Sequence, residues 1–188
     1  MVVTRLLLIS GSTRAASTNT AALRTVLALA PPDVEAVVHD GLADLPAFTP
    51  DADDSAPHPA VADLRTRLAD ADAVLLCTPE YAGALPGSLK NLLDWTVGTG
   101  DLYGKPAAWI NVAAPGRGTG ALAELRTVLG YVTAEIIGPA CVDIPVPRDA
   151  VTPAGTIDDP AIRAALTASL TAVVTHLRGQ TVDSASDA

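Results

Sequence analysis

Apolar residues follow two patterns along the chain: short continuous runs, and segments in which they recur every three or four positions. The first continuous run, residues 2–9, ends at Ser10-Gly11-Ser12. Such runs are typical of strands that a parallel sheet buries on both faces, whereas the wider spacing indicates helices. Strands are predicted over residues 2–9, 34–39, 73–77, 105–112 and 136–144, the last of them interrupted by Gly138-Pro139. Helices are predicted over residues 18–30, 61–68, 86–95, 121–132 and 160–177.

Strands that alternate with helices predict an α/β fold in which helices cover both faces of a parallel sheet. Because crossovers are right-handed, five strands of this kind fit a flavodoxin-like three-layer sandwich with strand order 2-1-3-4-5. A ligand of such a sheet lies beyond the carboxyl ends of the strands, between the first and third. We therefore expect the loops after these two strands to carry the chemistry.

The length of 188 residues suits one domain, which we expect to span residues 1–179. The polar segment 180–188 is predicted to be a disordered tail, and residues 41–59 are predicted to form a long loop. The apolar N-terminal run is short and lacks a basic leader, so we interpret it as a strand and expect no membrane partner.

The composition of the chain argues against several classes of partner and site, namely nucleic acids, disulfide frameworks and metal sites. A net charge of −9 would repel a polyanion, and 3% aromatic residues offer little to stack on bases, so no nucleic-acid partner is expected. Cys77 and Cys141 have no regular spacing, which favours a reducing cytoplasm over a disulfide framework. The three histidines lack the spacing of metal ligands, so no metal site is predicted.

The loop after the first strand is the first candidate site. It leads into a helix, where free backbone N–H groups and the helix dipole favour an anion. It lacks both GxxxxGK[ST] and GxGxxG, so we expect it to hold a phosphomonoester through side chains rather than a pyrophosphate. The alternative is that its hydroxyls only cap the helix and its arginine is solvated. The candidate phosphate ligands are Ser12, Arg14, Ser17, Thr18 and Asn19.

The loop after the third strand offers an aromatic side chain and small residues that would let backbone N–H groups approach a flat ring. Glu80 is interpreted either as structural or as lying at the ring edge. The alternative is an ordinary turn between strand and helix. The candidate ring-binding residues are Pro79, Glu80, Tyr81, Ala82 and Gly83.

Both loops carry a motif of a known family. Gly11, Ser12, Arg14, Ser17 and Asn19 match a GSxRxxSxN phosphate loop. A second motif, PEYNxxxPGxLKNxxDW, is matched at Pro79, Glu80, Tyr81, Pro86, Gly87, Leu89, Lys90, Asn91, Asp94 and Trp95. With both motifs at this separation, residues 3–178 resemble the NADPH-dependent FMN reductase family of the flavodoxin-like superfamily.

The resemblance implies an FMN-dependent oxidoreductase that transfers hydride from NADPH or NADH, through bound FMN, to a small acceptor. The acceptor would be a flavin, a quinone, an azo compound or a metal oxyanion, and no protein residue would be catalytic. A glycine-rich loop after the fourth strand would border the flavin, with Arg117 facing either the ring edge or a phosphate of the donor; the alternative is a flexible turn with a solvated arginine. Its candidate residues are Ala114, Gly116, Arg117 and Gly118.

One departure from the family and two alternatives remain. Ala82 replaces the usual Asn, so a side-chain contact near the ring is expected to be lost. The chain could instead be a flavodoxin-type electron carrier without NAD(P)H turnover, or a nucleotide-binding module built on the G-x-G-x-x-A of residues 116–121. Surplus apolar surface on the third helix predicts a homodimer or homotetramer, with part of that surface in the interface; its apolar residues are Leu85, Leu89, Leu92, Leu93 and Trp95.

Overall fold

In the computed structural model, which describes residues 3–51 and 57–186, six strands form one parallel sheet. Their order is β2-β1-β3-β4-β5, and β6 also pairs with β4, which confirms the predicted flavodoxin-like arrangement. Ile9 pairs with His39 on one side of β1 and with Leu76 on the other. The strands are β1 (Thr4–Ser10), β2 (Val34–His39), β3 (Ala73–Cys77), β4 (Pro106–Asn111), β5 (Glu135–Ile136) and β6 (Val142–Asp143).

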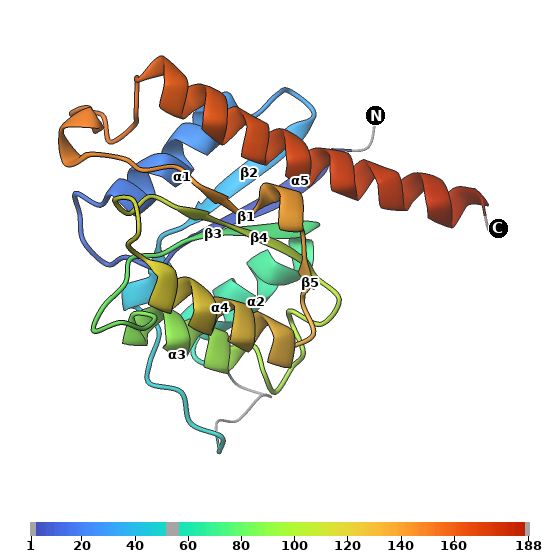
Figure 1. The fold of residues 1–188 in the computed structure, drawn as a ribbon. Coiled ribbons are helices and arrows are strands. Elements are labelled where there is room, and N and C mark those ends of the chain that lie inside the picture. Colours follow the sequence, from blue (N-terminus) through green and yellow to red (C-terminus); the bar gives the residue numbers. More distant parts are fainter. Residues whose placement is uncertain (1–2, 52–56, 187–188) are drawn as a thin grey trace.

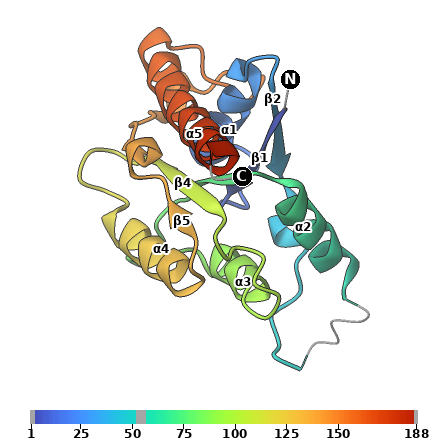
Figure 2. The ribbon, with the colours of Figure 1, turned by 90° about the vertical axis from the view of Figure 1, so that its right-hand side faces the viewer.

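Helices cover the sheet on both sides, as the alternating pattern predicts. Figures 1 and 2 show α1 and α5 on one face and α2, α3 and α4 on the other. The α-helices are α1 (Thr18–Leu29), α2 (Pro59–Asp70), α3 (Gly87–Trp95), α4 (Thr119–Tyr131) and α5 (Pro160–Ser186). Short 3-10 helices occur at η1 (Gly41–Ala43), η2 (Gly138–Ala140) and η3 (Arg148–Ala150).

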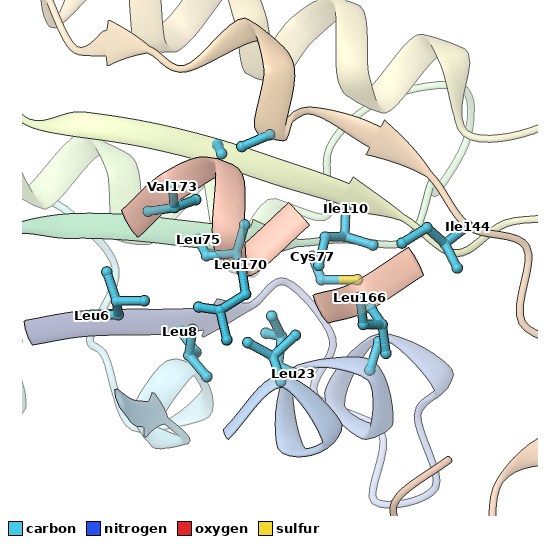
Figure 3. Packing of buried hydrophobic residues seen from close by; sticks show 14 of the residues in the cluster. Leu6, Leu8, Leu23, Leu75, Cys77, Ile110, Ile144, Leu166, Leu170 and Val173 are labelled. Carbon is cyan, nitrogen blue, oxygen red and sulfur yellow. The ribbon is translucent and has the colours of Figure 1, made fainter. Parts of the chain in front are cut away.

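Successive residues of β1 serve two separate cores, because side chains alternate between the faces of a strand. Leu6 and Leu8 pack toward α1 and α5, where Figure 3 shows them with Leu23 and Leu170. Leu7 and Ile9 pack instead with residues of α2, α3 and α4, on the other face of the sheet. Burial on both faces explains why the strands read as continuous apolar runs.

The predicted interruption of the fifth strand at Gly138-Pro139 is confirmed. The structure splits the strand into β5 and β6, with η2 between them, and both pieces pair with β4. Pro139 has no N–H to give to the ladder, and the chain turns there, with the N–H of Cys141 donating to the carbonyl of Gly138 at 3.1 Å. The interruption moves the following segment toward the carboxyl end of β4.

Two expectations need correction. The structure continues α5 to Ser186, over residues 180–186, where a disordered tail is predicted; a single Gly179 does not stop the helix, and residues 187–188 lie outside the described part. The apolar residues of and before α3 that were to form an interface between copies are buried within this chain. These are Leu85, Leu89, Leu92, Leu93 and Trp95.

The polar residues of the α3 motif hold the loop between β2 and α2. The side chains of Asn91 and Trp95 both donate to the carbonyl of Pro46 at 2.9 Å, and Asn91 Oδ1 accepts from the N–H of Phe48 at 2.7 Å. The rings of Phe48 and Trp95 meet edge to face at 5.2 Å. The long loop predicted at 41–59 therefore begins with η1 and is fastened to α3, while its residues 52–56 lie outside the described part.

Candidate functional site

A cleft of about 340 Å³ lies at the carboxyl ends of β1, β3 and β4. The loops that form it gather on the left of Figure 1. Predicted residues that line it are Ser12, Arg14, Ser17, Thr18, Asn19, Pro79, Glu80, Tyr81, Arg117 and Gly118. Predicted residues outside its lining are Ala82, Gly83, Ala114 and Gly116. Lining residues that the sequence analysis missed are Ala16, Thr78, Val112, Ala113 and Arg148.

Close packing brings the first and second loops together. The N–H of Gly11 donates to the carbonyl of Cys77 at 2.8 Å. A Cβ atom on Gly11 would lie 2.2 Å from Thr78 Oγ1 and 2.9 Å from a methyl carbon of Leu89, so glycine is required here. The start of α1 and the end of β3 thus face the same cleft at short range.

The side chains of the first loop present hydrogen-bond donors to the cleft, because their acceptor atoms are engaged by the protein. Ser12 Oγ accepts from the N–H of Arg14 at 3.3 Å, and Ser17 Oγ caps α1 by accepting from the N–H of Thr20 at 3.4 Å. Asn19 Oδ1 accepts from the buried thiol of Cys77 at 3.3 Å. The two hydroxyl protons and the amide of Asn19 remain available, which suits an anion that can only accept.

Three arginines line the cleft from three different loops. Arg14, Arg117 and Arg148 are all exposed, and their side chains have no ion-pair or hydrogen-bond partner among residues 3–51 and 57–180. Glu80, the acidic residue in the lining, has its carboxylate committed to backbone N–H groups. The cleft is therefore a positive region in a chain whose net charge is −9, and such a region attracts anions.

The second loop is a tight hairpin turn. The N–H of Tyr81 donates to the carbonyl of Ala84, and the N–H of Ala84 donates back, both at 3.0 Å. Ala82 and Gly83 have φ values of 52° and 77°, the pattern of a type I′ turn, for which Asn-Gly is the favoured pair. Asn at this position thus suits the backbone of the turn, whereas the predicted contact with a ring is not supported, since Ala82 lies outside the lining.

Two glutamates fasten this loop to α4. Glu80 Oε2 accepts from the N–H groups of Gly120 and Ala121 at 2.7 and 3.2 Å, and Glu124 Oε2 accepts from the N–H of Leu85 at 2.7 Å. A carboxylate beside the first turn of a helix is also favoured by the helix dipole. The structural interpretation of Glu80 is therefore the one that the contacts favour.

The third loop is held by Asn111 at the end of β4. Its Nδ2 atom donates to the carbonyl of Arg117 at 3.0 Å and to Asp143 Oδ1 at 2.7 Å, and its Oδ1 atom accepts from the N–H of Ala113 at 3.1 Å. Gly118 has a φ of 83°, and a Cβ atom there would lie 2.6 Å from Asn111 Oδ1. The loop is thus a fixed wall of the cleft rather than a free turn.

Ala114 and Gly116 belong to the turn that leads to Arg117 and Gly118. The N–H of Arg117 donates to the carbonyl of Ala114 at 2.9 Å, with Pro115 and a positive-φ Gly116 between them, the pattern of a type II turn. The glycines of the G-x-G-x-x-A pattern thus have backbone roles in this loop. This weakens the argument for a dinucleotide module built on them.

Neither cysteine carries the chemistry of an activated thiolate. Burial raises the pKa of the Cys77 thiol far above its usual range, and burial also raises that of Cys141.

Among the residues that the structure describes, no group of three or more His, Cys, Asp or Glu side chains could hold a metal ion. Within the same residues, no helix is long and apolar enough to cross a membrane.

Known proteins share both the sequence and the fold. A model of the NADPH-dependent FMN reductase family matches residues 4–145. The chain is 33% identical over 177 residues to an NAD(P)H-dependent FMN reductase of Pseudomonas aeruginosa, covering 91% of this chain and 95% of the relative. It is 36% identical over 132 residues to a 2-hydroxy-1,4-benzoquinone reductase of a Burkholderia species, covering 68% of this chain and 71% of the relative. A flavoenzyme NAD(P)H:(acceptor) oxidoreductase of Paracoccus denitrificans has a similar structure, with a TM-score of 0.73 and 28% identity over 93% of this chain and 99% of that one.

Proposed function

We propose, from the premise that this chain belongs to the NADPH-dependent FMN reductase family, that its cleft binds FMN with the phosphate at the start of α1. As a member of that family the chain is an oxidoreductase that uses FMN and NAD(P)H. When bound, FMN supplies the redox chemistry, and the protein supplies binding and orientation. The functional unit is proposed to be the domain of residues 1–179.

The donor set of the first loop is the observation that carries this assignment. Ser12, Ser17 and Asn19 each have an acceptor atom occupied by the protein and a donor left for the cleft. The N–H groups of Thr18 and Asn19 begin α1 and have no partner among the described residues. Arg14 adds a positive charge beside them. Such a set matches the oxygen atoms of a phosphomonoester, to which each charge-assisted bond contributes about 1.5–3 kcal/mol.

The remaining lining suits the rest of the cofactor. Tyr81, which is 47% exposed, lines the cleft, as do Pro79, which stiffens the turn before it, and Gly118, which offers close backbone approach. Glu80 acts indirectly, because its bonds to α4 keep the second and third loops at a constant separation. These residues would orient a flat ring, and the family assignment needs no acid or base from the protein.

The acceptor is proposed to be a small molecule, with a quinone as the first candidate. Support comes from the relatives named as benzoquinone and quinone reductases, each about one-third identical to this chain. The test is steady-state oxidation of NADPH by the FMN-loaded protein with and without a benzoquinone. Quinone-dependent turnover would support the proposal, whereas reducible FMN without turnover on quinones, azo dyes or free flavin would favour the electron-carrier alternative.

Comparing FMN with riboflavin tests the phosphate end directly, because riboflavin lacks only the phosphate. We expect wild-type protein to bind FMN at least about tenfold more tightly, since one charge-assisted bond corresponds to about that factor. Arg14→Gln should weaken FMN binding and leave riboflavin binding unchanged, as measured by quenching of flavin fluorescence. Equal affinity of the wild type for the two flavins would contradict the assignment.

We further propose a homodimer and a cytoplasmic location. Tyr103 and Tyr131 are 75% and 88% exposed on neighbouring segments, which the bond from the N–H of Gly104 to the carbonyl of Thr133 holds together at 2.9 Å. A second copy would cover these rings. Sedimentation of wild type and a double variant, Tyr103→Glu with Tyr131→Glu, tests this, with a smaller species expected for the variant.

The proposed cytoplasmic location rests on the cysteines. The free thiols of Cys77 and Cys141 suit a reducing compartment.

A further inference from the structure

Arg148 lies far along the chain from the loops in which the sequence shows motifs, yet it lines the same cleft. It is carried by a segment that we term the strap, residues 144–157, which includes η3. Figure 1 shows the strap in orange on its course from the sheet, past α1, to the start of α5. The split of the predicted fifth strand sends the chain along this course.

The strap is tied down at both ends. At its start, the N–H of Ile144 donates to the carbonyl of Asn111 at 2.7 Å, and the N–H of Val146 donates to that of Val112 at 3.0 Å. At its end, the N–H of Ile157 donates to Thr25 Oγ1 at 2.9 Å, in a fully buried contact. Thr25 belongs to α1, the helix whose first turn faces the cleft, so the strap and the first loop are fixed to one another.

The side chain of Arg148 has no structural task that accounts for it. It is exposed, and no acceptor pairs with its guanidinium within the described part of the chain. Glu80, which lines the same cleft, bonds to α4, and Asp143, which precedes the strap, bonds to Asn111. A guanidinium held at a cleft by an ordered strap, without a partner in the protein, is arranged for an anionic ligand.

We propose that Arg148 binds a phosphomonoester group of a ligand in the cleft, and this proposal rests on the proposed function above. Two such groups are available, the phosphate of FMN and the 2′-phosphate of NADPH. A guanidinium donates two parallel hydrogen bonds to phosphate oxygens, which an ammonium cannot reproduce. If the ligand group is that of FMN, Arg148 anchors the cofactor together with Arg14; if it is that of NADPH, Arg148 selects the electron donor.

The test compares Arg148→Gln and Arg148→Lys with wild type and with Arg178→Gln. The control removes the same charge from an exposed arginine of α5, outside the cleft and paired with Asp33. Fluorescence titration gives the Kd values for FMN and riboflavin, and spectral titration of FMN-loaded protein gives those for NADP⁺ and NAD⁺. Thermal melting checks that each variant is folded. We expect the variants to fold, because Arg148 is exposed to solvent.

If Arg148 binds the phosphate of FMN, Arg148→Gln weakens FMN binding about tenfold and leaves riboflavin affinity unchanged. If it binds the 2′-phosphate of the electron donor, the same variant weakens NADP⁺ binding by a similar factor and leaves NAD⁺ affinity unchanged. In either case Arg148→Lys recovers only part of the loss. Unchanged affinities, or an equal loss for NADP⁺ and NAD⁺, would overturn the inference and leave the proposed function standing. A wild-type protein that does not prefer FMN to riboflavin would instead contradict the proposed function.

Discussion

At the scale of the residue, Ala82 occupies a conformation that does not suit it. Its φ of 52° is left-handed, and alanine in such a conformation costs roughly 1 kcal/mol relative to glycine or asparagine. We expect Ala82→Asn to raise the free energy of unfolding by about 0.5–1 kcal/mol, measured by urea denaturation, and to leave FMN affinity unchanged. Ala82→Val should be less stable than wild type. An Asn variant that is no more stable would contradict the turn assignment.

Cys77 is expected to position Asn19 rather than to react. Its thiol donates to Asn19 Oδ1 at 3.3 Å and is fully buried. Cys77→Ala leaves that oxygen without its donor, so we expect a loss of about 1–2 kcal/mol in unfolding free energy and weaker FMN binding. Cys77→Ser keeps a donor and should bind FMN more tightly than the Ala variant does. Equal FMN affinity of both variants and wild type would show that the contact does not orient the amide.

At the scale of the element, α4 and the second loop approach each other as closely as a glycine allows. A Cβ atom on Gly120 would lie 2.1 Å from the carbonyl oxygen of Gly83, whereas one on Gly130, in the same helix, would meet nothing within 4 Å. We expect Gly120→Ala to cost about 1–3 kcal/mol, because the loop and its bonds through Glu80 must shift. Gly130→Ala should stabilise by up to about 1 kcal/mol, since alanine favours a helix.

Thermal and urea denaturation of the two alanine variants provide a matched comparison. Loss of FMN affinity should accompany Gly120→Ala alone, because only that change moves a wall of the cleft. If both variants gain stability, the contact between α4 and the second loop is not as close as described.

The sequence predicts most elements because parallel strands buried on both faces leave an uninterrupted apolar signal, as in β1 and β3. It also predicts the interruption of the fifth strand at Gly138-Pro139, because proline has no N–H to donate to the ladder, but it does not predict that a 3-10 helix separates two short strands there. Nor does it distinguish burial within the chain from burial between copies. Leu89 and Leu92 therefore suggested an interface, although both lie in the core.

At the scale of the whole molecule, stability should depend on pH through His39. Both of its ring nitrogens lack hydrogen-bond partners among the described residues, and its side chain is buried. Burial, with a smaller contribution from Arg67, lowers its pKa, against the opposing effects of Asp63, Asp40 and Asp44. The folded state therefore resists protonation of His39, while the unfolded chain accepts a proton below about pH 6.5.

The free energy of unfolding should thus fall as pH drops below about 6.5, by at most about 1.4 kcal/mol per pH unit from this residue. The His39→Leu variant should show a smaller fall between neutral and mildly acidic pH. Urea denaturation at several pH values measures both proteins, and the difference removes the effects of His58 and His176. Parallel profiles would contradict the assignment of a neutral, unpartnered His39.

The candidate site combines parts that the sequence reveals to different degrees. The first loop and the second loop are each one continuous stretch of sequence, so their residue types and spacing can be recognised without the structure. Most of their predicted residues line the cleft. Arg148 has no such local signal, because its position depends on the split strand and on the buried contact between Ile157 and Thr25. The three arginines converge only once the whole chain is folded, in a protein whose overall charge is negative.

The central claim is that one cleft holds FMN by its phosphate and lets NADPH reduce it. Anaerobic titration of the FMN-loaded protein with NADPH, followed by the visible absorption of the flavin, tests this most directly. We expect the absorption band to bleach in proportion to added NADPH and to return when a quinone is added. Protein that binds no FMN, or bound FMN that stays oxidised in excess NADPH, would contradict it.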